Sequence, residues 1–278
     1  MKKLIIILYS FFFLLCLINY NNIIQITNKI LMNFINIVIP SLFPLILLNN
    51  IFIKSGFFLV IIKKFPKLKE PLIILLTILL GAPSSLSFLS DLTKQNIINN
   101  KEKELVFFSF GGISFSFLYS LGLTIKNQNI YSFLLTYYIG EILIYIIFRN
   151  KNMFKRQTIK TIVFKKSIYF DSIKSSANLL LIIFVSSLLF NYSFMFNTNI
   201  FNINPLLCSL IEFSYSSFKA LNFSYISPIV LMFILSFLSF SIYFQIYYLD
   251  SSYDLLNHIK KRWFISTINS CLFFIFFF

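Results

Sequence analysis

Charge-free apolar stretches of about 20 residues recur along the 278-residue chain, and they constrain its fold more than any other feature. A helix of about that length crosses the roughly 30 Å hydrocarbon core of a membrane. Apolar residues make up 58% of the chain and charged residues 12%, against about a quarter charged in soluble domains. The sequence therefore predicts an all-α polytopic membrane protein that is surrounded by membrane lipid.

Full-length spans can be distinguished from shorter, interrupted segments. About seven transmembrane helices are expected, at residues 4–18, 31–53, 105–125, 130–148, 174–190, 227–249 and 263–278. The segments 71–89 and 205–221 are apolar but broken by small and polar residues, so they are expected to be re-entrant or broken helices. No small-residue cleavage site follows residues 4–18, which favours an uncleaved first span.

Basic residues gather in three loops, at residues 63–69, 149–166 and 258–262. The positive-inside rule places all three on the cytoplasmic side. This uneven distribution accounts for the net charge of +15 without any nucleic-acid partner.

The order of the elements repeats along the chain. Residues 31–150 contain a span, a short segment and two spans, beginning outside, and residues 174–278 repeat that order beginning inside. An N-terminal anchor region at 1–30 and a basic cytoplasmic linker at 151–173 complete the chain. Broken segments at matching positions of two inverted halves indicate a transporter binding site near the membrane midplane. The sequence thus predicts an inverted-topology repeat.

The residues that carry most enzyme chemistry are scarce. The chain has nine acidic residues and one histidine, His258, which is expected to be solvated near the last basic loop. Cys16, Cys208 and Cys271 are far apart, so no zinc spacing exists. We therefore expect no enzyme, no cofactor and no metal site.

A run of Gly, Pro and Ser interrupts the first short segment. A break there would leave a helix N-terminus within the membrane, where its amides and dipole favour an anion. Gly81, Pro83, Ser84 and Ser85 are therefore candidate substrate-binding residues. An ordinary short loop between two tilted helices is the alternative.

Carboxylates within apolar segments are a second group of candidates. Glu212 and Lys219 are seven residues apart and share a helical face, with Ser216 between them. A carboxylate at membrane depth needs a partner or a wet cavity, so this pair would hold substrate, couple a proton or form a structural ion pair. Glu141, midway along residues 130–148, is either a further proton-coupling group or a buried structural carboxylate.

Small residues complete the candidate site. They would line the cavity, or else simply let membrane helices pack closely. Four of them, the serines, belong to a short internal match between residues 108–116 and 235–241. The candidates are Ser109, Gly111, Gly112, Ser114, Ser236 and Ser239.

A series of short motifs resembles the sporulation integral membrane protein YlbJ family, whose members carry two nucleoside-recognition (Gate) domains. The resemblance covers about residues 31–278. The motifs are Pro40-Ser41-Leu42-Phe43-Pro44, Gly81-Ala82-Pro83-Ser84-Ser85, Leu210-Ile211-Glu212 and the segment from Ser236 to Gln245.

The resemblance implies a role in endospore formation. It suggests a transporter in the bacterial cell membrane that moves a small organic anion, dipicolinate, across the outer forespore membrane. The alternative is a membrane scaffold or a subunit of a sporulation complex that moves no substrate. A homo-oligomer is left open in both cases.

Overall fold

A computed structural model describes residues 20–116, 118–119, 130–150, 153–154, 167–201, 210, 228–251 and 253–277. Every regular element in these residues is helical, which confirms the predicted all-α class. The α-helices are α2 (Tyr20–Asn33), α3 (Ile39–Lys54), α4 (Phe57–Lys64), α5 (Lys69–Leu80), α6 (Ser84–Lys94), α7 (Asn100–Phe110), α9 (Ile130–Phe148), α10 (Ile168–Phe201), α13 (Pro228–Phe237), α14 (Phe240–Leu249) and α15 (Leu255–Phe277). A π-helical turn, Phe34–Val38, and a 3-10 turn, Pro66–Leu68, join neighbouring helices.

Two helical stretches in the described residues are long and apolar enough to cross a membrane. They are Ile168–Tyr192 in α10 and Ile229–Leu249, which covers α13 and α14. The bent pair Ile23–Asn36 and Ile39–Lys54 makes a third if it is counted as one span. Seven spans were expected, but the one at residues 4–18 lies outside the described residues, so the count of seven stays a prediction.

Two expectations about the extent of helices are wrong. The predicted span at 105–125 is not one helix, because α7 ends at Phe110 and non-helical backbone follows from Gly111 to Ser114. Gly111 and Gly112 are adjacent and have low helix propensity. The prediction of this span used the average hydropathy of the segment, which is insensitive to helix propensity. The residues 258–262, expected as a loop, lie within α15.

The bend between α2 and α3 has a local cause. The π-helical turn at Phe34–Val38 precedes Pro40 and Pro44, and the two helices meet at 51°. Proline lacks an amide hydrogen and its ring crowds the preceding turn, so both features favour a kink here.

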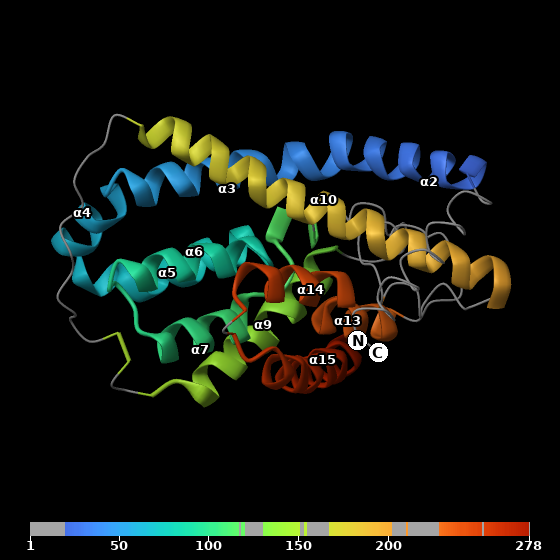
Figure 1. Ribbon diagram of the computed structural model, residues 1–278. Coiled ribbons are helices and arrows are strands. Elements are labelled where there is room, and N and C mark those ends of the chain that lie inside the picture. Colours follow the sequence, from blue (N-terminus) through green and yellow to red (C-terminus); the bar gives the residue numbers. More distant parts are fainter. Residues whose placement is uncertain are drawn as a thin grey trace, which may run out of the picture.

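The helices pack into two groups that share one apolar core (Figure 1). α10 lies along α2 and α3 on one side of the molecule, while α9 and α15 pack together on the other. α13 packs along α15, and α14 contacts α10, α15 and α6. The breaks between α5 and α6, after α7, and between α13 and α14 therefore lie in the interior.

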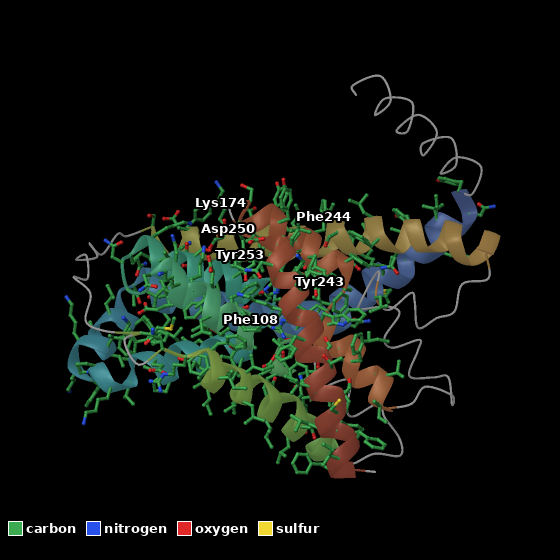
Figure 2. All side chains as sticks on the ribbon, turned by 90° about the horizontal axis from the view of Figure 1, so that it is seen from below. Phe108, Lys174, Tyr243, Phe244, Asp250 and Tyr253 are labelled. Carbon is green, nitrogen blue, oxygen red and sulfur yellow. The ribbon has the colours of Figure 1, made fainter. Side chains whose placement is uncertain are left out.

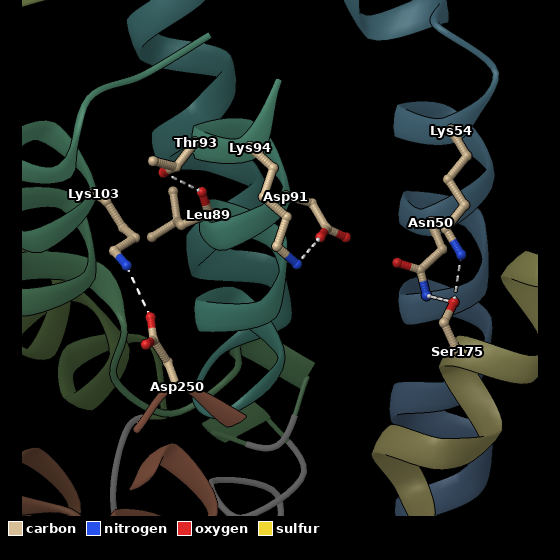
Figure 3. Close-up of polar contacts among 9 residues, drawn as sticks. All are labelled: Asn50, Lys54, Leu89, Asp91, Thr93, Lys94, Lys103, Ser175 and Asp250. Carbon is tan, nitrogen blue, oxygen red and sulfur yellow. Dashed lines mark hydrogen bonds and ion pairs between the residues drawn. The ribbon is translucent and has the colours of Figure 1, made fainter. Parts of the chain in front are cut away.

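A polar clamp joins α3 to α10. The Lys54 ammonium and the Asn50 amide both donate to Ser175 Oγ, at 2.8 and 3.2 Å (Figure 3). The Asn50 amide also donates to Ser176 Oγ at 2.8 Å. Lys54 also donates to the carbonyl oxygen of Asp171 at 2.8 Å. These bonds connect the first predicted repeat with the second.

The distribution of polarity is the reverse of that in a soluble domain. Large apolar side chains such as Ile147, Phe170 and Ile275 are more than 60% exposed, while many Ser, Thr and Asn side chains are buried. Membrane helices commonly pack through small and polar residues and present apolar residues to lipid. This distribution, with the two long apolar stretches, indicates association with a membrane.

Candidate functional site

The breaks after α5 and after α7 lie directly against each other. The Ala82 amide donates a hydrogen bond to the Gly112 carbonyl oxygen at 2.6 Å. Gly81 has φ +61°, and a Cβ there would overlap the backbone nitrogen of Ser114. Only glycine allows this approach, so the sequence places Gly81 where two interrupted helices meet.

The second break also contacts α9. The Ile113 amide donates to the Tyr137 hydroxyl at 3.1 Å. A Cβ on Gly112 would overlap that hydroxyl and would lie 2.6 Å from Glu141 Oε1 and 3.3 Å from Arg262 Nη1. Gly112 is therefore needed to bring the break up to the polar side chains of α9 and α15.

Arg262 and Glu141 form a buried ion pair beside Gly112. Arg262 Nη1 lies 3.3 Å from Glu141 Oε1, and the two side chains are 0% and 1% exposed. Within the described residues, Nε and Nη2 of Arg262 and Oε2 of Glu141 have no hydrogen-bond partner. A buried guanidinium with two unpaired nitrogens is costly, so these nitrogens favour binding of a group that accepts hydrogen bonds.

The third break separates α13 from α14. Leu238 has φ +73°, and the Tyr243 hydroxyl donates to the Phe237 carbonyl oxygen, which the break leaves without a helical donor. The hydroxyls of Ser239 and Ser241 lie 3.0 Å apart at the N-terminus of α14.

Asn269 of α15 ties this break to the ion pair. Its amide donates to Ser236 Oγ at 2.9 Å, just before α13 ends. Its Oδ1 would overlap a Cβ on Gly140, the residue next to Glu141. α15 therefore holds polar side chains against α9 and α13 at once.

Two tyrosines lie close to His258 in the first turn of α15. Tyr243 and Tyr253 are labelled in Figure 2. Their rings lie 6.1 and 5.4 Å from the ring of His258. The Tyr253 hydroxyl lies 3.0 Å from His258 Nδ1, and His258 stacks on Phe107 at 5.0 Å. His258 is buried, so the expectation of a solvated histidine is wrong.

Burial lowers the pKa of His258 well below its ordinary value, and the Arg262 and Lys261 charges lower that pKa further. His258 precedes the last predicted span at 263–278. The imidazole is therefore neutral in the folded protein at neutral pH.

The hydroxyls at the start of α6 complete the candidate site. Ser84 and Ser85 are buried in the first turn of this 11-residue helix, and neither Oγ has a partner within the described residues. Ser109, the second-last residue of α7, is likewise buried without a partner within the described residues.

A largely buried ion pair also joins α7 to the end of α14. Lys103 Nζ of α7 lies 2.8 Å from Asp250 Oδ2, which follows the end of α14 (Figure 3). It fixes the position of α7 relative to α14 away from the buried breaks.

Most of the residues singled out from the sequence lie at the three breaks. Gly81, Pro83, Ser84 and Ser85 lie at the first, Ser109, Gly111, Gly112 and Ser114 at the second, and Ser236 and Ser239 at the third. Glu141 faces the second break. Glu212, Ser216 and Lys219 lie outside the described residues.

Sequence reasoning missed Arg262 and Asn269. Arg262 was counted among the cytoplasmic loop charges, yet it is fully buried within α15. A signal was available, because His258, Arg262, Ser266 and Asn269 recur at helical spacing and form one polar stripe on an otherwise apolar segment.

Comparisons of the chain with protein-family models, with curated proteins and with solved structures found no match.

Proposed function

We propose that this protein is a membrane transporter of a small organic anion, and that the anion binds where the three helix breaks meet Arg262. The observation that carries the proposal is the buried Arg262 guanidinium, whose Nε and Nη2 have no partner within the described residues. A carboxylate accepts two parallel hydrogen bonds from such an edge.

The helix breaks support an anion rather than a cation. α6 and α14 both begin at a break, so the positive end of each helix dipole lies at a break. The buried Ser84 and Ser85 hydroxyls at the start of α6 can donate further hydrogen bonds. Two helix N-termini and a guanidinium together favour a negatively charged ligand.

The positions of the breaks also support an inverted repeat. The internal match between residues 108–116 and 235–241 coincides with the break after α7 and the break between α13 and α14. Interrupted helices at matching positions of two halves are a common feature of secondary transporters. On this proposal the chain has about seven spans in two inverted halves, and Glu212 and Lys219 belong to the second half of the site.

Dipicolinate is the first substrate to test, because the motifs that resemble the YlbJ family imply it, together with a role in sporulation at the outer forespore membrane. The chain would be reconstituted in liposomes and uptake of labelled dipicolinate measured. We expect uptake by the natural chain, and a loss of at least about tenfold in Arg262→Lys, because lysine lacks the two-pronged edge.

Arg149→Lys is the matched control, since Arg149 pairs with Glu70 at the surface, at 2.7 Å. It should transport normally. Equal uptake by the natural chain and Arg262→Lys would remove Arg262 from the site. Absence of uptake by well-folded natural protein would favour the scaffold instead.

A further inference from the structure

The charges at the Arg262–Glu141 pair balance when no ligand is bound. One guanidinium faces one carboxylate, and the ion pair with Arg262 is the contact that neutralises Glu141 in the described residues. The other titratable groups facing the pair are Tyr137 and Tyr138 of α9, Tyr243 of α14, and Tyr253 and His258 at the start of α15. None of these supplies a second positive charge while His258 is neutral.

The free edge of Arg262 is on the side away from Glu141. Glu141 Oε1 lies 3.3 Å from Nη1, whereas Nε and Nη2, whose hydrogens point along the opposite edge, are unpartnered within the described residues. An incoming carboxylate can therefore bind Arg262 without displacing Glu141. The site would then hold two carboxylates on one guanidinium.

Two buried carboxylates on a single guanidinium leave one negative charge uncompensated. A buried carboxylate without its own counter-charge takes up a proton rather than remain ionised. Oε2 of Glu141 is buried and unpartnered within the described residues, so it can accept that proton while Oε1 stays against Nη1.

We propose that Glu141 couples anion binding to the uptake of one proton, so that each carboxylate bound at Arg262 enters the site together with one H⁺. This inference rests on the proposed function. The proton comes from the aqueous phase on the side from which the anion enters and converts the Glu141 carboxylate to the neutral acid. It leaves when the anion leaves, so the anion itself is unchanged. With a monocarboxylate bound the site stays electrically neutral, and the second carboxylate of a dicarboxylate adds one further negative charge.

Binding of labelled dipicolinate and of labelled benzoate to the purified full chain tests the coupling between pH 6 and 8. Dipicolinate has a second carboxylate, so its binding should take up at least one proton. For benzoate, a monocarboxylate, affinity should rise as pH falls, by up to about tenfold per pH unit, because one proton is taken up per anion. In weakly buffered solution the same binding should remove one proton from the medium per anion bound.

Glu141→Gln is the informative variant. Gln keeps the contact with Nη1 but carries no charge, so the empty site is already positive and binds a carboxylate without a proton. Its affinity should not change with pH, and no proton should be taken up. Glu70→Gln is the control, because it changes a partly exposed carboxylate that pairs with Arg149. Its affinity should depend on pH as strongly as that of the natural chain.

The outcomes separate the two proposals. The coupling is overturned if the affinity of Glu141→Gln depends on pH as that of the natural chain does, or if the natural chain binds without proton uptake. Neither result contradicts the anion site at Arg262. Binding of both anions by Arg262→Lys with natural affinity places the site elsewhere and overturns both proposals. Proton uptake by the natural chain supports the coupling even if Glu141→Gln fails to fold.

Discussion

The Ala82 amide donates a hydrogen bond to the Gly112 carbonyl oxygen at 2.6 Å, so two helix breaks that are 30 residues apart in sequence form one structure. Each break satisfies a backbone group that the other exposes. In a membrane interior, where water does not reach lipid-facing backbone, such bonds satisfy the polar groups that interrupted helices leave free.

Gly81→Ala tests that close approach. A methyl group at this position would overlap the Ser114 backbone nitrogen, and alanine also disfavours φ +61°. We expect the free energy of unfolding to fall by about 2–4 kcal/mol, which would be measured as a lower midpoint of thermal unfolding in detergent.

Gly56→Ala is the control for this substitution. Gly56 also has a positive φ, 74°, but it lies before α4, away from the three breaks. Its substitution should cost only the backbone strain, about 1 kcal/mol. Equal losses in the two variants would mean that the contact with Ser114 does not limit the fold.

The buried ion pair should show strong coupling in stability. Glu141→Leu or Arg262→Met alone leaves an uncompensated buried charge and should cost about 3–5 kcal/mol. The double variant buries two apolar side chains instead and should recover most of that loss. Denaturation of the four proteins under one detergent condition gives the coupling energy, and additive losses would contradict a direct interaction.

Because His258 is buried, we expect the free energy of unfolding to decrease at acid pH. Its pKa is lowered in the folded protein, so the unfolded chain binds a proton that the folded chain does not. The stabilisation is complete above about pH 6.5 and falls below it, by up to about 1.4 kcal/mol per pH unit.

Unfolding midpoints of the natural chain between pH 7.5 and 5.5 measure this dependence. His258→Gln removes the titrating group and should flatten it, although the variant is less stable overall because its stacking on Phe107 is lost. A variant with the same decline as the natural chain would assign the pH dependence to other groups.

Cysteine labelling tests the predicted topology. In a chain with Cys16, Cys208 and Cys271 replaced by Ser, a single cysteine at Lys67 should react from the cytoplasmic face, because it lies in a basic loop. A single cysteine at Asn197 should react from the outside only, because the predicted span at 174–190 begins inside and Asn197 follows it. Cytoplasmic labelling at Asn197 would contradict the inverted repeat.

The sequence predicted the class of fold, because long apolar stretches recur along the chain. It also predicted the first break, because Gly81 and Pro83 interrupt an apolar segment. It did not predict that residues 105–125 are broken, because average hydropathy hides the two glycines at 111 and 112. It also did not predict the association of Ala82 with Gly112, which depends on tertiary packing.

Arg262 shows a limit of counting charges. The positive-inside rule assigns a cluster of Lys and Arg to one side of the membrane, but it does not distinguish a side chain that faces water from one that faces the bundle interior. Helical periodicity does make that distinction here, since Arg262 shares its face with Ser266 and Asn269.

The clamp between Asn50, Lys54 and the serines of α10 has a mechanical consequence. α3 and α10 come from different predicted repeats, yet these bonds make them one frame. A rocking motion of one whole repeat against the other would have to break the clamp in every cycle. If the protein is the transporter proposed above, α3 and α10 would form a fixed frame, and the broken helices and α15 would move against it to expose the Arg262 site to each side in turn.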